Sequence, residues 1–177
     1  MPCVRNSVSS QVTCEAHVKR FQYPVLLTIA EEGGYVVTCR DLPQLITQGE
    51  DEQDALAQAA DAMDEVFATY MIENLAFPEP SEVEPGERLV APPAETMAKA
   101  ALYVAMRDAG VSKAQLARQL GVDEKEVRRL LDPHYGSKLP RIAEAVSLLG
   151  QHLVIGLEPG KMGSDTITVF SRPADPF

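Results

Sequence analysis

The stretch SKAQLARQLGVDEKEVRRLL, residues 112–131, predicts two short helices joined by a tight turn. Ser112 and Asp123 can each cap the start of one helix, because their side-chain oxygens can accept a hydrogen bond from a free amide of the first turn. Each is followed three residues later by a polar side chain, Gln115 or Glu126, that can return to the amide of the capping residue. The stretch therefore predicts two helix starts, each with a capping box.

The turn between these helices contains Gly121, which can adopt the left-handed backbone that a tight connection needs. Apolar residues of both helices fall on one inward face, namely Leu116, Ala117, Leu120, Val122, Val127 and Leu130. The pattern is typical of a DNA-binding helix-turn-helix, whose second helix enters the major groove. An ordinary pair of packed helices is the alternative interpretation.

The composition is that of a globular protein, with 177 residues, 45% apolar and 24% charged, enough for one domain or two. No apolar run approaches the roughly 18 to 20 residues of a membrane span, and the N-terminus lacks the apolar core of a secretion signal. We therefore expect a cytoplasmic protein without membrane contact. Cys3, Cys14 and Cys39 should be reduced thiols, because three cysteines cannot all pair and none has zinc-site spacing.

The net charge of −10 is unevenly distributed along the chain. Residues 1–90 carry five Lys and Arg against sixteen Asp and Glu, whereas residues 91–160 carry nine against eight. Residues 112–141 alone carry seven basic and four acidic side chains. The acidic half should be repelled by phosphate and suits a basic protein partner, whereas the second half can approach a polyanion.

The first half of the chain predicts a small antiparallel sheet covered by a helix. Residues 23–30 and 35–40 are rich in β-branched and apolar residues around the turn 31–34, and residues 44–48 can form a third strand. Residues 50–74 then follow a helical period, with Asp51 as the expected cap. The expected buried stripe is Leu56, Ala59, Ala60, Met63, Val66, Phe67, Tyr70 and Met71.

The second half predicts helices and one strand. After the proline-rich segment 77–86 and a fourth strand at 88–91, an alanine-rich helix is expected over 96–109. Its inward residues are Ala98, Ala101, Leu102, Ala105 and Met106. A last helix ends at Leu149 and should bury Leu139, Ile142, Ala145, Val146 and Leu149. Residues 152–157 form a strand pattern with no predicted partner among helices, so we expect this strand to join a second copy of the chain.

These elements predict an α+β protein with four segments. Residues 1–21 form a flexible leader and residues 22–91 a β-β-β-α-β module. Residues 92–158 form an all-α helix-turn-helix domain with a short C-terminal strand, and residues 159–177 a tail.

The order of the pieces resembles the HicB antitoxins of HicAB toxin-antitoxin systems, with an Xre-type helix-turn-helix. The resemblance covers roughly residues 22–157 and is carried by YPVLL, EEGGYVVTC, DLPQLITQGE, DEQDAL and SKAQLARQLGV. It implies that the N-terminal module has a partial RNase H-like fold without catalytic competence. That module would bind and mask a small basic HicA-type messenger RNA endonuclease, with Glu31, Glu32, Tyr35, Asp41 and Asp64 as candidate toxin contacts.

The resemblance also implies that the C-terminal domain represses its own operon by binding a palindromic operator of two half-sites, as a homodimer or higher oligomer. The candidate DNA-binding residues are Lys113, Gln115, Glu124, Lys125, Arg128 and Arg129. By position Lys113 and Arg129 would contact phosphate, while Arg128 would face bases. Glu124 departs from the pattern, because an acid in the groove is repelled by phosphate and is useful only by accepting from a cytosine amino group.

Nothing in the sequence predicts catalysis, a cofactor or a metal site. The acids of the first half do not form the convergent cluster that two-metal nuclease chemistry needs, and His17, His134 and His152 lack partners at metal-ligand spacing. We therefore expect no enzyme. Two other functions stay open: a stand-alone transcriptional repressor with an N-terminal module that senses a small molecule, and a metal-dependent nuclease.

Overall fold

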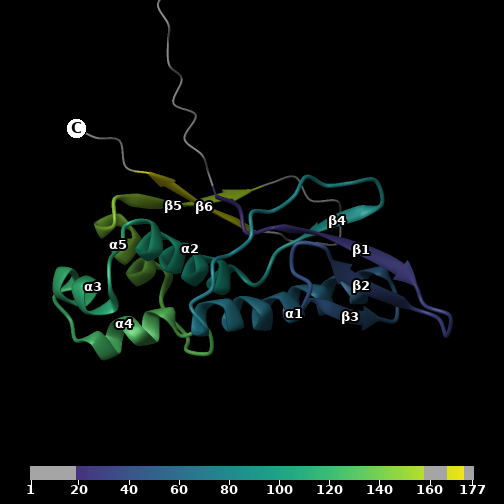
Figure 1. The fold of residues 1–177 in the computed structure, drawn as a ribbon, viewed down its shortest axis with the longest axis horizontal. Helices are drawn as coiled ribbons and strands as arrows, with labels where there is room; N and C mark the ends of the chain where they lie inside the picture. The colour runs from purple at the N-terminus through teal and green to yellow at the C-terminus, as the bar shows by residue number, and fades with distance from the viewer. Residues whose placement is uncertain (1–18, 158–166, 174–177) are drawn as a thin grey trace, which may run out of the picture.

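The structure, a computed structural model, describes residues 19–157 and 167–173. In Figure 1 a sheet with one long helix lies at one end of an elongated molecule, and a group of shorter helices lies at the other. The elements are β1 (Tyr23–Ile29), β2 (Tyr35–Cys39), β3 (Ile46–Gly49), α1 (Glu52–Ile72), β4 (Glu87–Val90), α2 (Ala94–Asp108), α3 (Lys113–Leu120), α4 (Glu124–Leu131), α5 (Leu139–Leu148), β5 (Gln151–Leu157) and β6 (Ile167–Pro173). This arrangement confirms the predicted α+β class.

The first four strands form one antiparallel sheet in the order β3-β2-β1-β4. Because side chains alternate along a strand, every second residue faces α1. Val25, Val37 and Cys39 are buried on that side, while Leu26 and Ile46 are exposed on the other. The N-terminal module is therefore a two-layer unit of sheet and helix (Figure 1).

Helix α1 begins as the sequence predicts. Asp51 is its N-cap and accepts a hydrogen bond from the Asp54 amide at 2.8 Å, while the Asp54 carboxylate accepts from the Glu50 amide at 2.9 Å. The predicted stripe is confirmed: five of its members are buried and three are partly buried against the same core. The fully or largely buried members are Ala59, Met63, Val66, Phe67 and Met71.

Two glycines permit the close approach of the β1–β2 turn, β3 and α1. Gly34 has a φ of +76°, and a β-carbon on it would lie 2.5 Å from the carbonyl oxygen of Gly49. A β-carbon on Gly49 would lie 2.3 Å from the amide nitrogen of Ala55, in the first turn of α1. Atoms this close would overlap, so Gly34 of EEGGY and Gly49 of TQG are required by packing.

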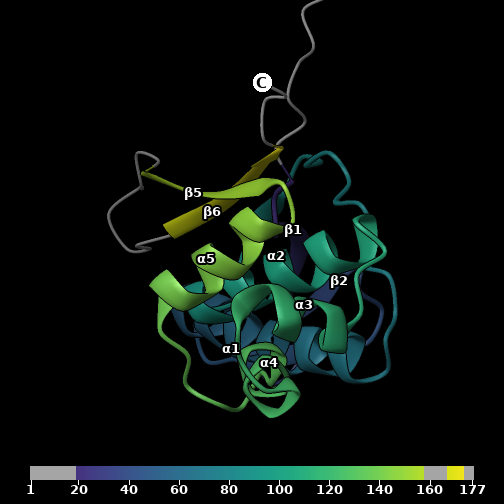
Figure 2. The same ribbon diagram turned by 90° about the vertical axis from the view of Figure 1, so that its left-hand side faces the viewer.

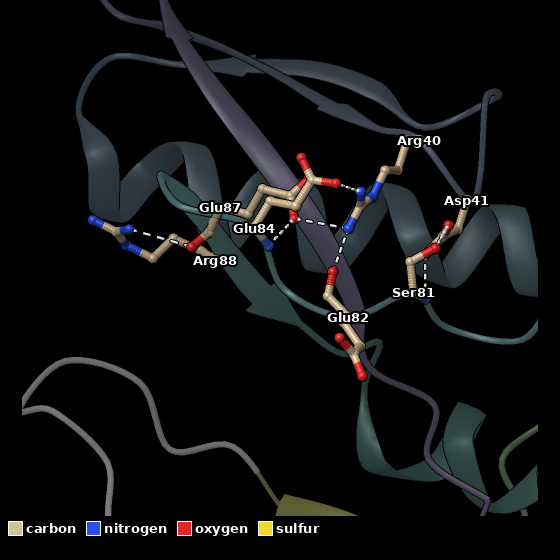
Figure 3. A network of polar contacts seen from close by, with 7 residues as sticks. All are labelled: Arg40, Asp41, Ser81, Glu82, Glu84, Glu87 and Arg88. Atoms are coloured by element: carbon tan, nitrogen blue, oxygen red, sulfur yellow. Dashed lines mark hydrogen bonds and ion pairs between the residues drawn. The ribbon is translucent and has the colours of Figure 1, made fainter.

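The proline-rich segment between α1 and β4 is tied to the end of β2 (Figure 3). Both carboxylate oxygens of Asp41 accept from Ser81, one from its amide at 2.9 Å and one from its hydroxyl at 2.6 Å. The Arg40 guanidinium donates to the Glu84 carboxylate and the Glu82 carbonyl, and to Glu87 at 3.2 Å. This network holds an extended, proline-rich segment that has no repeating backbone hydrogen bonds of its own.

Helix α2 lies at the centre of the molecule, between the sheet module and the other helices (Figures 1 and 2). All five inward residues predicted for it are buried. Its Tyr103 hydroxyl donates to the Leu75 carbonyl at 2.7 Å, and its ring meets Phe77 edge-on with centroids 5.8 Å apart. One apolar cluster therefore runs from the sheet through α2 into α3, α4 and α5, across the predicted boundary at residue 91.

Three sequence expectations for the last part of the chain need correction. The strand at 152–157 was expected to lack a partner in its own chain, but β5 pairs antiparallel with β6 along its full length, from Gln151 opposite Pro173 to Leu157 opposite Ile167. The segment expected to be a loose tail therefore contains a strand. Leu139 was expected to be buried, but it is 37% exposed at the start of α5.

Phe21, at the end of the predicted leader, is buried and packs edge-on against Phe67, with ring centroids 6.1 Å apart. The rest of that leader, residues 1–18, lies outside the described residues. None of the described helices combines the length and apolar character that a membrane span requires.

Candidate functional site

Helix α3 starts with the capping box that the sequence predicts. The Gln115 amide donates to the Ser112 hydroxyl oxygen at 3.3 Å, and the Gln115 side-chain oxygen accepts from the Ser112 amide at 2.8 Å. The helix ends at Gly121, which has a φ of 67°, and the Val122 amide donates back to the Ala117 carbonyl at 3.0 Å. The predicted turn is therefore confirmed.

Helix α4 starts with only half of the predicted box. The Asp123 carboxylate accepts from the Glu126 amide at 2.8 Å, as expected. The Glu126 carboxylate does not return to the cap, because it accepts two hydrogen bonds from Arg141 of α5, at 2.9 and 3.1 Å. The expectation of a second complete capping box was wrong. Glu126 instead ties the second helix of the motif to α5.

The two helices present one polar surface to solvent. Figure 2 looks onto this end of the molecule, where α4 lies at the lower edge with α3 above it. The inward residues of the motif are buried or partly buried in the core. Among the six candidate DNA-binding residues Glu124 is half-buried, and the others are exposed, namely Lys113, Gln115, Lys125, Arg128 and Arg129. All six are therefore on two adjoining helices, and α4 is not packed inside the molecule.

Glu124 and Arg128 form an ion pair along α4. The Glu124 carboxylate oxygen Oε1 accepts from Arg128 Nη2 at 2.6 Å and from Nε at 3.1 Å. The acid that departs from the expected pattern therefore neutralises a basic side chain one helical turn away. In this arrangement the guanidinium is held along the helix surface.

Arg129 is held by the loop that follows α4. Its guanidinium carbon lies 5.3 Å from the centroid of the Tyr135 ring, a cation–π geometry. Its carbonyl accepts from the Ser137 hydroxyl at 3.4 Å. The loop 132–138 therefore contacts both the side chain and the backbone of this candidate phosphate ligand.

Sequence reasoning missed Lys99, which is 0% exposed in the middle of α2. Its ammonium donates to the Asp132 carbonyl at 2.9 Å, the Pro133 carbonyl at 3.3 Å and the Tyr135 carbonyl. It also forms an ion pair with Glu95 at 3.0 Å. No sequence pattern indicates this role, because a lysine in an alanine-rich helix is usually solvated and a sequence does not show which backbone carbonyls a side chain will meet.

Glu95 completes this group. Its carboxylate accepts from the Ser137 amide at 2.6 Å as well as from Lys99. Partial burial alone would raise the pKa of Glu95, but the Ser137 amide and the Lys99 ammonium favour the charged form more, so its pKa lies below the ordinary value. The glutamate is therefore ionised at neutral pH beside the buried ammonium.

The acidic module has a cleft at the tip of the β1–β2 turn, next to β3 and the start of α1. Three of the candidate toxin contacts, Glu31, Glu32 and Tyr35, line it. The other lining residues include Gln48, Glu50, Asp54 and Gln58. The structure therefore brings these three predicted residues together with two further acids, Glu50 and Asp54, at the start of α1.

The remaining two candidates lie elsewhere. Asp41 is at the end of β2 and holds Ser81, as described above. Asp64 is on α1 and accepts a hydrogen bond from the Thr96 hydroxyl of α2. Both carboxylates have partners within the chain, and neither lines the acidic cleft. Within the part of the chain that the structure describes, no three His, Cys, Asp or Glu side chains are grouped so as to hold a metal ion.

Comparison with known proteins gives consistent matches. A family model described as a HicB-like antitoxin of a bacterial toxin-antitoxin system matches residues 22–101. The chain is 33% identical to the antitoxin HicB of Escherichia coli K12 over 132 residues, which cover 75% of this chain and 96% of that protein. It is 33% identical to the antitoxin HicB 1 of Photorhabdus laumondii over 141 residues, covering 80% and 90% of the two chains.

A second Photorhabdus laumondii protein, antitoxin HicB 2, is 36% identical over 135 residues, covering 76% of this chain and 95% of that one. All three relatives are named antitoxins, in agreement with the family resemblance stated from the sequence. Their matches extend over most of the chain, well beyond the 80 residues at positions 22–101.

Proposed function

This chain belongs to the family of HicB-like antitoxins of bacterial toxin-antitoxin systems, and on that premise we propose two activities for it. It neutralises a small basic HicA-type messenger RNA endonuclease through its N-terminal module. It also represses its own operon by binding operator DNA through α3 and α4. Both activities belong in the cytoplasm, where messenger RNA and the operon are found.

The observation that carries the DNA-binding proposal is the exposed, basic surface of a helix-turn-helix whose inward face is buried. Lys113, Lys125, Arg128 and Arg129 are exposed on two helices joined at Gly121. In such a motif the second helix enters the major groove with its first residues toward base edges. Residues 112–141 carry more basic than acidic side chains, although the whole chain is acidic.

The test of this proposal is a titration of the purified protein with the DNA upstream of its own gene, at several salt concentrations. We expect binding that weakens as salt rises, because each neutralised phosphate adds about −0.9 to the slope of log K against log salt. A competing fragment of unrelated sequence should bind far more weakly. Equal affinity for both fragments would contradict operator recognition.

A palindromic operator requires two copies of the chain. One small DNA-binding module buries only about 600 to 1,000 Å², so specific affinity comes from two copies on half-sites about one helical turn apart. We therefore propose a homodimer or higher oligomer. Light scattering of the purified protein measures this directly, and a monomer at the concentrations that saturate the operator would contradict it.

The toxin-binding proposal is supported by the acidic cleft. Glu31, Glu32 and Glu50 are exposed around it, and the half-buried Asp54 at the start of α1 also lines it. Opposite charges across an interface steer association and select the partner. A cationic surface of the toxin therefore fits this cleft.

Charge reversal tests the cleft. The double variant Glu31→Lys and Glu32→Lys should lose capture of the co-expressed basic toxin and fail to restore growth. The matched control is Glu65→Lys with Glu73→Lys, which makes the same change in net charge at exposed positions further along α1 and at its C-terminal end. Equal loss in both variants would show that overall charge, and not the cleft, binds the toxin.

A further inference from the structure

We propose that Lys99 is a positioning residue for DNA binding, which fixes the loop after α4 and, through Tyr135, places Arg129 for a phosphate contact. The inference rests on the proposed DNA-binding function and assigns a role to a residue that touches no DNA. Three observations support it. The Lys99 ammonium is buried, it binds Glu95 and carbonyls of the loop after α4, and Tyr135 of that loop contacts Arg129.

The first step is the burial of the ammonium. Lysine is almost never fully buried unless it is paired, because removing its charge from water is costly. Lys99 meets this condition with the Glu95 carboxylate and three carbonyls of the loop, those of Asp132, Pro133 and Tyr135. The loop thus folds around a buried cation.

The second step is the position of that cation at the end of α4. Asp132 is the C-cap of α4, so its carbonyl lies at the negative end of the helix dipole. The ammonium of α2 therefore fastens the last turn of the DNA-facing helix. A second contact fixes the other end of the loop, where the Glu95 carboxylate accepts a hydrogen bond from the Ser137 amide at 2.6 Å.

The third step leads to Arg129. The carbonyl of Tyr135 is held by Lys99, and the ring of Tyr135 lies under the Arg129 guanidinium at 5.3 Å. The loop that surrounds the ammonium therefore presents the ring that supports this arginine. Lys99 is 0% exposed and cannot reach a phosphate, so any effect of Lys99 on DNA binding passes through the loop.

The decisive measurement is the salt dependence of binding to the upstream DNA. Removing a phosphate contact weakens binding uniformly across sequences and reduces the salt slope by about one. Arg129→Ala should show this change directly. Lys99→Met, which keeps the length of the side chain but loses the charge, should show the same reduction although residue 99 contacts no DNA.

Variants of Tyr135 provide the test if Lys99→Met does not fold. Tyr135 is 46% exposed, so its replacement disturbs little packing. Tyr135→Ala removes the ring under Arg129 and should weaken binding about fivefold to tenfold with a reduced salt slope. Tyr135→Phe keeps the ring and is the matched control, which should bind like the unmodified protein.

A double-mutant cycle completes the experiment. If Lys99 and Tyr135 act through Arg129, then Lys99→Met or Tyr135→Ala should cause no further loss in a chain that already carries Arg129→Ala. An unchanged salt slope in folded Lys99→Met and in Tyr135→Ala, while Arg129→Ala changes it, overturns the inference and leaves the proposed function intact. Failure of the unmodified protein to bind DNA instead overturns the proposed function, and the inference with it.

Toxin capture separates positioning from general damage. The cleft at Glu31 and Glu32 lies at the β1–β2 turn. Figure 1 shows that this turn is far from the connection between α4 and α5. Lys99→Met should therefore keep toxin capture while it loses DNA affinity. Parallel loss of both activities, together with an unchanged salt slope for the remaining binding, identifies a purely structural role and contradicts the inference.

Discussion

Arg128 and Glu124 lie one turn apart on the exposed side of α4. Their ion pair gives Glu124 a partner within the protein, so the acid does not need a DNA contact to explain it. An exposed pair at this spacing contributes only about 0.3 to 0.5 kcal/mol to stability. Arg128 can therefore exchange Glu124 for a base or phosphate at little cost. The sequence pattern placed both residues on the outward face, but it could not reveal that they bind each other, because the side-chain conformations decide this.

Replacement of Arg128 tests its proposed role in reading bases in the major groove. Arg128→Ala should weaken operator binding by about 1 to 3 kcal/mol, the contribution of an arginine that reads a guanine through two hydrogen bonds. Arg88→Ala is a suitable control, because Arg88 is also an exposed arginine in an ion pair, with Glu52 at 3.1 Å, but lies in the sheet module. Titration of both variants at one salt concentration gives the comparison. Equal affinities would remove Arg128 from the reading surface.

The lowered pKa of Glu95 predicts a pH dependence of stability. Since its pKa is lowered on folding, the charged carboxylate stabilises the folded chain at pH values above the ordinary pKa of 4.5, and this contribution is lost as the pH falls through the folded value. Glu95→Gln should therefore be less stable than the unmodified protein at pH 7, with a smaller difference at pH 3.5. Urea unfolding at both pH values measures this. A difference that is constant with pH would contradict the assignment.

At the scale of elements, most of the fold follows from local patterns. The hairpin, the acidic helix start and the helix-turn-helix were predictable because each is specified by neighbouring residues: alternation, a cap, or a glycine in a turn. Strand β6 was missed because its partner β5 is separated from it by residues 158–166 and the segment has mixed composition. The ion pair between Glu126 and Arg141 was missed for a similar reason. The local pattern predicts that Glu126 caps its own helix, but its carboxylate binds an arginine of another helix instead.

Gly49 gives a prediction about how β3 meets α1. Gly49→Ala should destabilise the protein by about 1 to 3 kcal/mol or more, because the added methyl group would lie 2.3 Å from the Ala55 amide nitrogen. Gly136→Ala is the control, since no atom lies within 4 Å of a β-carbon there and its φ is not positive. Urea unfolding followed by circular dichroism compares the two. A Gly49→Ala protein as stable as the Gly136→Ala protein would contradict the packing argument.

At the scale of the whole molecule, the sheet module and the helices share their interior. Phe77 packs against both Phe67 of α1 and Tyr103 of α2, with ring centroids 4.6 and 5.8 Å apart. Thr96 and Asp64 add a hydrogen bond between the same two helices. The sequence predicted two segments with opposite charge, and this division of charge is compatible with one continuous core. The sequence does not predict that the core is continuous. Helix α2 has apolar residues on most of its surface, and its alanine-rich pattern does not show which elements pack against each side.

The shared core predicts that both halves unfold together. Thiol labelling of buried Cys39 reports on the sheet, and far-ultraviolet circular dichroism reports mainly on the helices. In a chain in which Cys3 and Cys14 are replaced by serine, the two probes should give the same urea midpoint. Two separate midpoints would show that the halves are independent folding units.

The continuous packing through α2 also links the lifetimes of the two proposed activities. A protease that unfolds either half must disrupt the same hydrophobic core, so we expect no trimmed fragment that keeps only one of the two proposed activities. If the chain has both proposed activities, degradation of one molecule should therefore release its toxin and end its repression of the operon in a single event.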